Sequence, residues 1–243
     1  MRHERLTVLI CALLFPLTGF APGVFADDVP KDVPRDPWVV VRNCVKGAKK
    51  LDDYTCTLEL QERLLGKLRG VQTIASRFRR TPFSVYMKWT AGPYKGREAL
   101  YVDGANDGMM FVYLGDWPRF RRVVRIRPDS AEIKSCARHP ITVAGVHYLV
   151  RRMHEQYTRA AAAGTLRSRV DRTEKLDGRL TIRLVRELED GGRRVWNVDA
   201  KIWVPVRVAC WDKKGKLIEC YWYRDLKPNA RLDDEAFDPG EIW

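Results

Sequence analysis

Few residues of this 243-residue sequence have the types and spacing that chemistry requires. Cys136 and His139 form the best nucleophile and base pair, but they share an irregular segment, and no third residue can be assigned to orient the histidine. His147 and His154 stand two helical turns apart, which places them badly to share a metal ion. The motifs GxSxG, HExxH, GxxxxGK(S/T) and GxGxxG do not occur. We therefore expect no enzyme, metal or cofactor, and keep an unrecognised hydrolase as an alternative.

The formal net charge of +13 is spread along the chain, because arginines occur throughout rather than in one block. Dispersed charge favours a solvated cationic surface, and the alternative is attraction to anionic membranes, lipid headgroups or acidic envelope polymers. A cationic envelope module that binds acidic polymer or partner proteins is therefore one function hypothesis. No nucleic-acid-binding module is recognisable, so we expect no nucleic-acid partner.

The N-terminus has the pattern of a secretory signal peptide over residues 1–26. A basic start precedes an apolar run at 6–20, and small residues end at Ala26, where we expect cleavage. The run is shorter than the roughly 20 residues of a membrane span. Residues 27–35 then predict an extended leader, and 36–243 predict a single domain. We expect a periplasmic or secreted protein.

Two segments have the period of amphipathic helices. Asp36 as N-cap and Pro37 at the first helical position predict a helix over 37–51. Thr142 is expected to cap a second helix that ends near Gly164. The apolar stripe of this second helix comprises Val143, Val146, Val150, Met153 and Tyr157.

Alternating apolar and polar residues predict antiparallel strands with one dry face each. One strand after Pro82 places four apolar side chains on the same side, namely Phe83, Val85, Met87 and Trp89. Residues 109–114 are apolar on both sides, which predicts a central, covered strand.

The clearest predicted hairpin turns at residues 213–215. We expect a three-residue loop with Gly215 in the left-handed conformation, because a two-residue loop would place Val208 opposite Glu219. This loop predicts three facing pairs, which are Val206 with Trp222, Val208 with Cys220 and Cys210 with Ile218. One face of the hairpin is then wholly apolar, and the residues that point inwards are Val206, Val208, Ile218 and Trp222.

Cysteines offer one candidate disulfide, between Cys44 and Cys56. Helical residues from Cys44 advance about 10 Å, and extended residues up to Cys56 return about 13 Å, so the two side chains meet. The alternative is that both are small core residues. Cys210 and Cys220 lie diagonally on the hairpin, too far apart for a bond.

The order of helix, strands, helix and strands predicts an α+β fold, in which an antiparallel sheet carries its helices on one face. The apolar strand faces then form either a packed core or the wall of a cavity. A curved sheet with too few helices to fill its concave side leaves a cavity, as in half-barrels that hold acyl chains. The residues alone leave both interpretations open.

Several stretches together resemble the LolA/LolB-like lipoprotein carriers. They are the strand at 54–58, the segment 77–83 leading to Trp89, the turn at 102–104, and the C-terminal hairpin with its Phe237-Asp238-Pro239 ending. The stretches 96–102, 106–108 and 138–142 are similar to a secreted bacterial family of unknown function that is related to those carriers.

The resemblance implies an incomplete β-barrel, a strongly curved antiparallel sheet with helices on its concave face, that holds lipid or lipoprotein acyl chains without a cofactor. It implies transfer partners in the inner or outer membrane and peripheral membrane contact, and we expect a monomer. Arg80 lies where the carriers have a Lys-Arg-Pro turn, so the resemblance implies that it contacts a lid. The expected cavity lining comprises Phe83, Val85, Met87, Trp89, Val146, Val150, Met153, Val206, Val208, Ile218 and Trp222.

Overall fold

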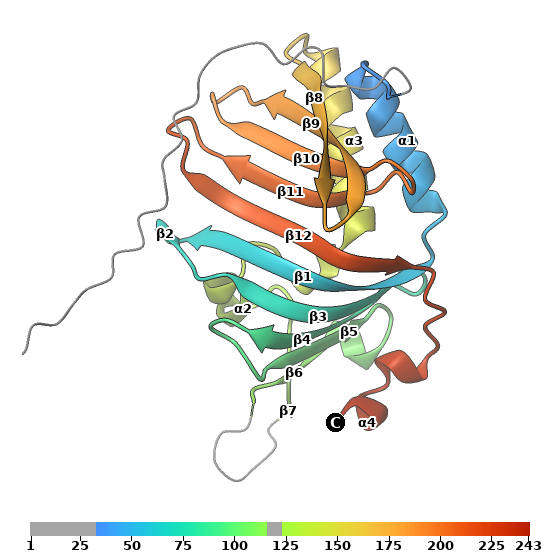
Figure 1. Cartoon of the computed structure of the whole chain (residues 1–243). Coiled ribbons are helices and arrows are strands. Elements are labelled where there is room, and N and C mark those ends of the chain that lie inside the picture. The colour runs from blue at the N-terminus through green and yellow to red at the C-terminus, as the bar shows by residue number, and fades with distance from the viewer. Residues whose placement is uncertain (1–32, 116–122) are drawn as a thin grey trace, which may run out of the picture.

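The computed structural model describes residues 33–115 and 123–243 (Figure 1). The expected signal peptide at 1–26 and most of the expected leader lie outside the described residues. The helices are α1 (Pro37–Lys49), α2 (Ala131–Cys136), α3 (Val146–Ala162) and α4 (Pro239–Ile242), with 3-10 turns η1 (Asn106–Gly108), η2 (Ile141–Val143) and η3 (Glu235–Phe237). No described helix is long and apolar enough to span a membrane.

Twelve strands of the described residues build one antiparallel sheet, in the order β7-β6-β5-β4-β3-β1-β12-β11-β10-β9-β8, with β2 paired to β1 beside this path. They are β1 (Asp53–Leu64), β2 (Lys67–Leu68), β3 (Gln72–Arg79), β4 (Ser84–Ala91), β5 (Glu98–Val102), β6 (Met110–Tyr113), β7 (Val123–Ile126), β8 (Arg167–Leu176), β9 (Arg179–Glu187), β10 (Arg193–Asp199), β11 (Pro205–Trp211) and β12 (Leu217–Pro228). The end strands β7 and β8 stay unpaired with each other, so the sheet curves without closing (Figure 1). The predicted fold, an α+β incomplete barrel, is confirmed.

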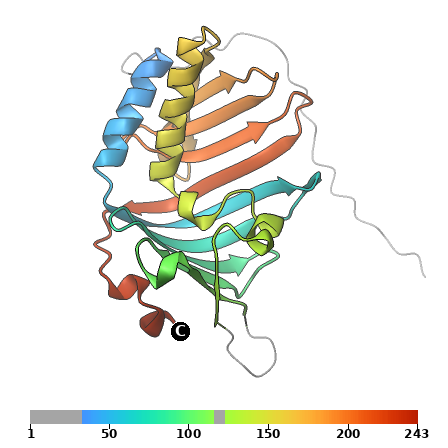
Figure 2. The same ribbon diagram turned by 180° about the vertical axis from the view of Figure 1, so that it is seen from behind.

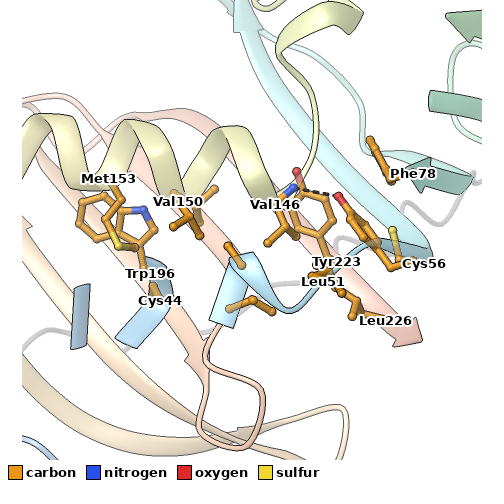
Figure 3. Close-up of a cluster of buried hydrophobic side chains, with 14 of the residues drawn as sticks. Cys44, Leu51, Cys56, Phe78, Val146, Val150, Met153, Trp196, Tyr223 and Leu226 are labelled. Atoms are coloured by element: carbon orange, nitrogen blue, oxygen red, sulfur yellow. Dashed lines mark hydrogen bonds between the residues drawn. The ribbon is translucent and has the colours of Figure 1, made fainter. Parts of the chain in front are cut away.

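Helices α1 and α3 lie side by side across the concave face of the β8–β12 half of the sheet (Figure 2). Figure 3 shows Cys44 of α1 and Met153 of α3 near Trp196, which comes from β10. Trp38 of α1 packs edge-on against Tyr157 of α3, with 5.7 Å between the ring centroids. These side chains belong to one apolar core, which joins the two helices to this half of the sheet.

The residues at their N-termini set where the two long helices, α1 and α3, begin. The Asp36 carboxylate accepts a hydrogen bond from the Trp38 N–H at 2.8 Å, and Pro37 follows as predicted. The second helix begins at Val146, and Thr142 lies in η2, so the prediction that Thr142 caps it is wrong. The apolar stripe of that helix is buried, as its period predicted, through Val146, Val150, Met153 and Tyr157.

Gly145 sets the start of α3 because the chain passes very close to the sheet there. Its φ is +90°, and a Cβ atom would lie 2.7 Å from the Tyr54 hydroxyl and 3.0 Å from the Phe78 ring. The Val146 N–H donates to that same hydroxyl at 2.8 Å. A glycine therefore lets the helix begin directly on top of the sheet.

The hairpin of β11 and β12 has the predicted loop but not the predicted register. Gly215 has a φ of +73°, and Trp211 pairs with Leu217, as a three-residue loop requires. A β-bulge follows, in which Ile218 is left without a partner and Cys210 pairs with Glu219. All pairs beyond the bulge are shifted by one residue.

The shift exchanges the two faces of β12. Trp222 now lies opposite Arg207 on the convex face, where the guanidinium groups of Arg207 and Arg224 stack on its ring. Glu219 and Tyr221 point instead to the concave side. Three predicted pairs are therefore wrong, namely Val206 with Trp222, Val208 with Cys220 and Cys210 with Ile218.

The strand predicted at 109–114 is not central. It forms β6, which lies second from the edge, between β5 and the unpredicted strand β7. A separate apolar cluster covers the convex face nearby, where Phe237 packs with Tyr86 and Leu100. The C-terminal segment thus runs across the outside of the sheet beside β4 and β5 (Figure 1).

The cysteines at 44 and 56 are free thiols in the core, so the predicted disulfide is wrong. Cys44 lies on α1 and Cys56 on β1, and both are buried. Burial raises the pKa of the Cys44 thiol to about 12 and raises that of Cys56 as well. The alternative of two small core residues is the one that the structure shows.

Candidate ligand cavity

The concave face is hollow between its centre and the β7 edge. A cavity of about 450 Å³ lies there, bounded on the sheet side by β1, by the strands from β3 to β7 and by side chains of β10, β11 and β12. Helix α2, residues 137–145 and part of α3 form the opposite wall. Figure 2 shows α2 and this connecting segment in front of the concave side of the sheet.

Most of the cavity wall is apolar. Ten of its side chains are Leu58, Leu60, Met87, Trp89, Met110, Val112, Val124, Ile126, Ile133 and Leu149. The polar edge of one of them is satisfied, because the Trp89 indole N–H donates to the Gln72 side-chain oxygen at 2.7 Å. The volume falls within the range of ligand pockets in proteins, about 300–1,000 Å³.

Of the eleven residues predicted to line the cavity, the structure places some in its wall and others elsewhere. Met87, Trp89, Met153 and Val208 line the cavity. Four others lie buried outside the lining of this cavity, namely Val85, Val146, Val150 and Val206. Phe83 packs against Tyr101 with ring centroids 6.2 Å apart. Ile218 at the bulge and Trp222 on the convex face lie outside the lining, which corrects their predicted inward orientation.

One end of the cavity carries a buried carboxylate, that of Glu219. It accepts a hydrogen bond from Arg138 Nε at 3.1 Å and contacts His139 Nε2 at 3.1 Å and Arg194 Nη2 at 3.5 Å. Burial alone would raise the pKa of this carboxyl, but His139 and the two arginines outweigh it and lower the pKa to about 2. Glu219 is therefore an anion at every physiological pH.

A second buried carboxylate, that of Glu62, lies opposite Glu219 across β1 and β12. It accepts hydrogen bonds from the Tyr221 hydroxyl and from the Arg138 backbone N–H, the latter at 3.1 Å. Burial and the nearby Glu62 charge raise the pKa of Tyr221. The two carboxylates together fasten the segment at Arg138 and His139 to the sheet, which fixes one wall of the cavity.

Cys136 and His139 both line the cavity, and the structure gives the histidine an orienting carboxylate that the sequence did not reveal. The Cys136 thiol donates to the Ile133 carbonyl at 3.3 Å. Burial raises the pKa of this thiol, which disfavours the reactive thiolate. No group of His, Cys, Asp and Glu in the described part of the chain is arranged to hold a metal ion.

Arg80 lies at the end of α1. Its Nη1 donates to the Lys49 carbonyl at 2.9 Å, and its Nη2 pairs with Asp52. Arg80 therefore touches a helix that covers the concave face, and its role in locking a lid stays a prediction.

Sequence reasoning missed α2, β7 and the two inward carboxylates. Ser130 carried a signal for α2, because its hydroxyl caps the Ile133 N–H at 3.4 Å. Glu62 carried a signal for its own inward position, because it continues the alternation of Leu58 and Leu60 along β1. A charged residue in phase with an apolar strand face indicates a buried partner.

A strongly curved, open antiparallel sheet with helices on its concave face defines the class of incomplete-barrel proteins. The chain belongs to the DUF1571 family, proteins of unknown function, whose family model matches residues 51–241. This confirms the expected membership in a family of unknown function. No curated protein matches the chain.

Several solved structures are similar to this chain at low sequence identity. A chain of the Pseudomonas aeruginosa MucA/MucB complex matches 85% of this chain with a TM-score of 0.52 and 13% identity, and this chain spans 62% of it. Lipoprotein LppX from Mycobacterium tuberculosis has a TM-score of 0.48 and 13% identity, over 83% of this chain and 98% of that one. A LolA superfamily protein from Nitrosomonas europaea has a TM-score of 0.37 and 10% identity, over 85% and 99%.

Proposed function

We propose that the protein is an exported, non-enzymatic binding protein that carries acyl chains of lipid or lipoprotein in the cell envelope. The observation that carries the proposal is the cavity of about 450 Å³, whose wall is mostly aliphatic and aromatic. Burying each methylene of an acyl chain there contributes about 0.8 kcal/mol before entropic losses. The sequence resemblance to lipoprotein carriers supports the same ligand class.

The signal-peptide pattern at 1–26 supports export to the periplasm or to the outside of the cell. A monomeric carrier then exchanges its cargo with transfer partners at a membrane. The net charge of +13 favours such encounters with anionic membrane surfaces.

Native mass spectrometry of the protein after gentle extraction tests the proposal. We expect co-purified lipid, released when the protein is unfolded. Protein that stays ligand-free after incubation with lipid vesicles would argue against a carrier.

A matched pair of variants locates the binding. Trp89→Glu introduces a charge into the cavity wall, whereas Trp222→Glu introduces the same charge on the convex face. We expect Trp89→Glu to lower lipid occupancy about tenfold or more, because burying an unpaired charge costs several kcal/mol. Trp222→Glu should bind as the wild type does. Val112→Trp, which fills the cavity without adding charge, should reproduce the loss.

The convex face favours a second candidate function, a cationic module that binds acidic polymer or a partner protein. The guanidinium of Arg207 lies 5.3 Å from the Trp222 ring centroid, and that of Arg193 lies 4.9 Å from Trp211. Among the ion pairs of residues 33–115 and 123–243, neither arginine takes part. The MucA/MucB neighbour is itself a protein complex. Binding that weakens strongly with salt would support this function over lipid capture.

A further inference from the structure

Two arginines face each other on the concave side of the sheet. Arg186 of β9 and Arg194 of β10 are paired directly across their strands. Like charges in this position destabilise a sheet, whereas opposite charges stabilise it. The pair therefore costs stability unless a third group neutralises it.

Arg186 is buried without a counterion. The residue is 7% exposed, its Nε–H has no hydrogen-bond partner, and it forms no ion pair with any described residue. Its guanidinium lies 5.8 Å from the Tyr157 ring centroid, which contributes a weak cation–π contact. Burial lowers the pKa of this arginine, and the neighbouring Arg194 lowers it further. Glu189 favours its charge, but the carboxylate of Glu189 is bound by Thr165 at 2.7 Å.

Arg194 shares its counterion with other groups. Glu219 contacts Arg194 at 3.5 Å, but it lies closer to Arg138 and His139, at 3.1 Å each. Arg194 Nη1 donates to the neutral side chain of Gln156 at 2.8 Å, and its Nε is buried without a partner. The carboxylate of Glu219 is thus divided among Arg138, His139 and Arg194, and Arg186 has no ion pair of its own among the described residues.

We propose that Arg186 and Arg194 bind the anionic headgroup of an amphiphile whose apolar chain occupies the cavity. Arg194 lines the cavity and Arg186 lies beside it, so a headgroup at the pair continues directly into the apolar wall. The planar donors of a guanidinium fit phosphate and carboxylate oxygens alike. The inference rests on the proposed function and adds the class of cargo, anionic rather than uncharged.

Ligands of equal chain length test the headgroup. Hexadecanoate and hexadecyl phosphate should each bind the full chain about tenfold more tightly than hexadecan-1-ol, measured by displacement of a fluorescent probe, because charge-assisted hydrogen bonds hold the anion. Arg186→Gln should remove most of this preference and leave the affinity for hexadecan-1-ol within about twofold. Arg186→Lys, which keeps the charge, should retain part of it.

Arg167→Gln is the control, since it removes one positive charge from an exposed position on β8. It should bind all three ligands as the wild type does, and melting temperatures check that each variant is folded. Equal affinity of the wild type for anionic and uncharged ligands would overturn the headgroup assignment but leave the carrier function standing. Inorganic phosphate that binds as tightly as hexadecyl phosphate would show that the apolar chain adds no affinity, which would overturn the carrier function as well. Failure of all three chain ligands to bind would also overturn the proposed function.

Discussion

The two halves of the sheet share one antiparallel ladder but are filled in opposite ways. Over β8–β12, the helices α1 and α3, of 13 and 17 residues, cover a core in which Ile182 and Leu184 are fully buried. Over β3–β7, the cover is the six-residue α2 and the segment at 137–145, and a cavity of about 450 Å³ remains, which reaches Trp196 and Val208 at the border of the other half. The difference teaches that one concave surface can provide stability in its packed half and space for a ligand in its hollow half.

The largest expected effect comes from removing the centre of the packed half. Leu184→Ala should lower the free energy of unfolding by about 3–5 kcal/mol, because Leu184 is fully buried outside the cavity lining and its loss leaves a void. Met110→Ala in the wall of the hollow half should cost less than about 2 kcal/mol, since it already borders empty space. Urea denaturation measures both. Equal costs would remove the distinction between the two halves.

Acid should destabilise the fold through the Glu219 carboxylate, which lies beside the cavity. Folding lowers the pKa of Glu219 from 4.5 to about 2, so this carboxyl stabilises the fold above pH 4.5 and loses that contribution as the pH falls towards 2. Across that window the wild type should lose up to about 3 kcal/mol more than Glu219→Gln does. Urea midpoints between pH 5 and pH 2.5 test this. Glu155→Gln, at a more exposed site on α3, should follow the wild type.

A smaller effect is expected at the junction of the two halves, where α3 begins on the sheet. Gly145→Ala should cost about 2 kcal/mol, because its φ is positive and the added Cβ meets Tyr54 and Phe78. Gly164→Ala also has a positive φ, but nothing lies within 4 Å, so about 1 kcal/mol is expected. Thermal unfolding measures the stability of both variants, and the difference between their losses is the part due to contact of the added Cβ with Tyr54 and Phe78. Equal losses would show that the close approach to the sheet is not limiting.

The smallest effects are expected from removing helix caps, and they should show whether each half of the sheet unfolds globally or locally. Asp36→Ala and Ser130→Ala each remove an N-cap, of α1 and α2 respectively, and each should cost its helix about 1 kcal/mol. In the packed half, the loss should appear in global unfolding. In the hollow half, it should appear as faster amide hydrogen exchange in α2, with a global midpoint that hardly moves. A global effect of Ser130→Ala would show that α2 is part of the core.

Elements set by neighbouring residues were predictable from the sequence, and pairings set by distant residues were not. Asp36 and Pro37 located α1 because a cap acts over a few residues. The hairpin register failed at Ile218, because the bulge turns Glu219 towards Arg138, some 81 positions away. Such a contact leaves no trace in local alternation.

The candidate site was predictable only in its apolar part. Alternation along β4 placed Met87 and Trp89 on the wall that they form. The pair of Arg186 and Arg194 depends on which strands lie together, and that follows from the fold. The sequence did carry a signal for Arg186, because Arg186 lies two residues after Leu184 on β9 and so points to the same inward face. The sequence of β9 alone does not show that Arg194 of β10 lies opposite.

The C-terminal segment has a consequence for how the hollow half meets its ligand. Phe237 packs against the outside of β4 and β5, the Trp243 indole donates to Glu98 at 3.0 Å, and Asp234 pairs with Arg79 at 2.6 Å. This external brace holds the strands from the side that the ligand never touches. The cavity wall is therefore ordered before a ligand arrives. Binding of an acyl chain then costs no free energy for ordering the wall.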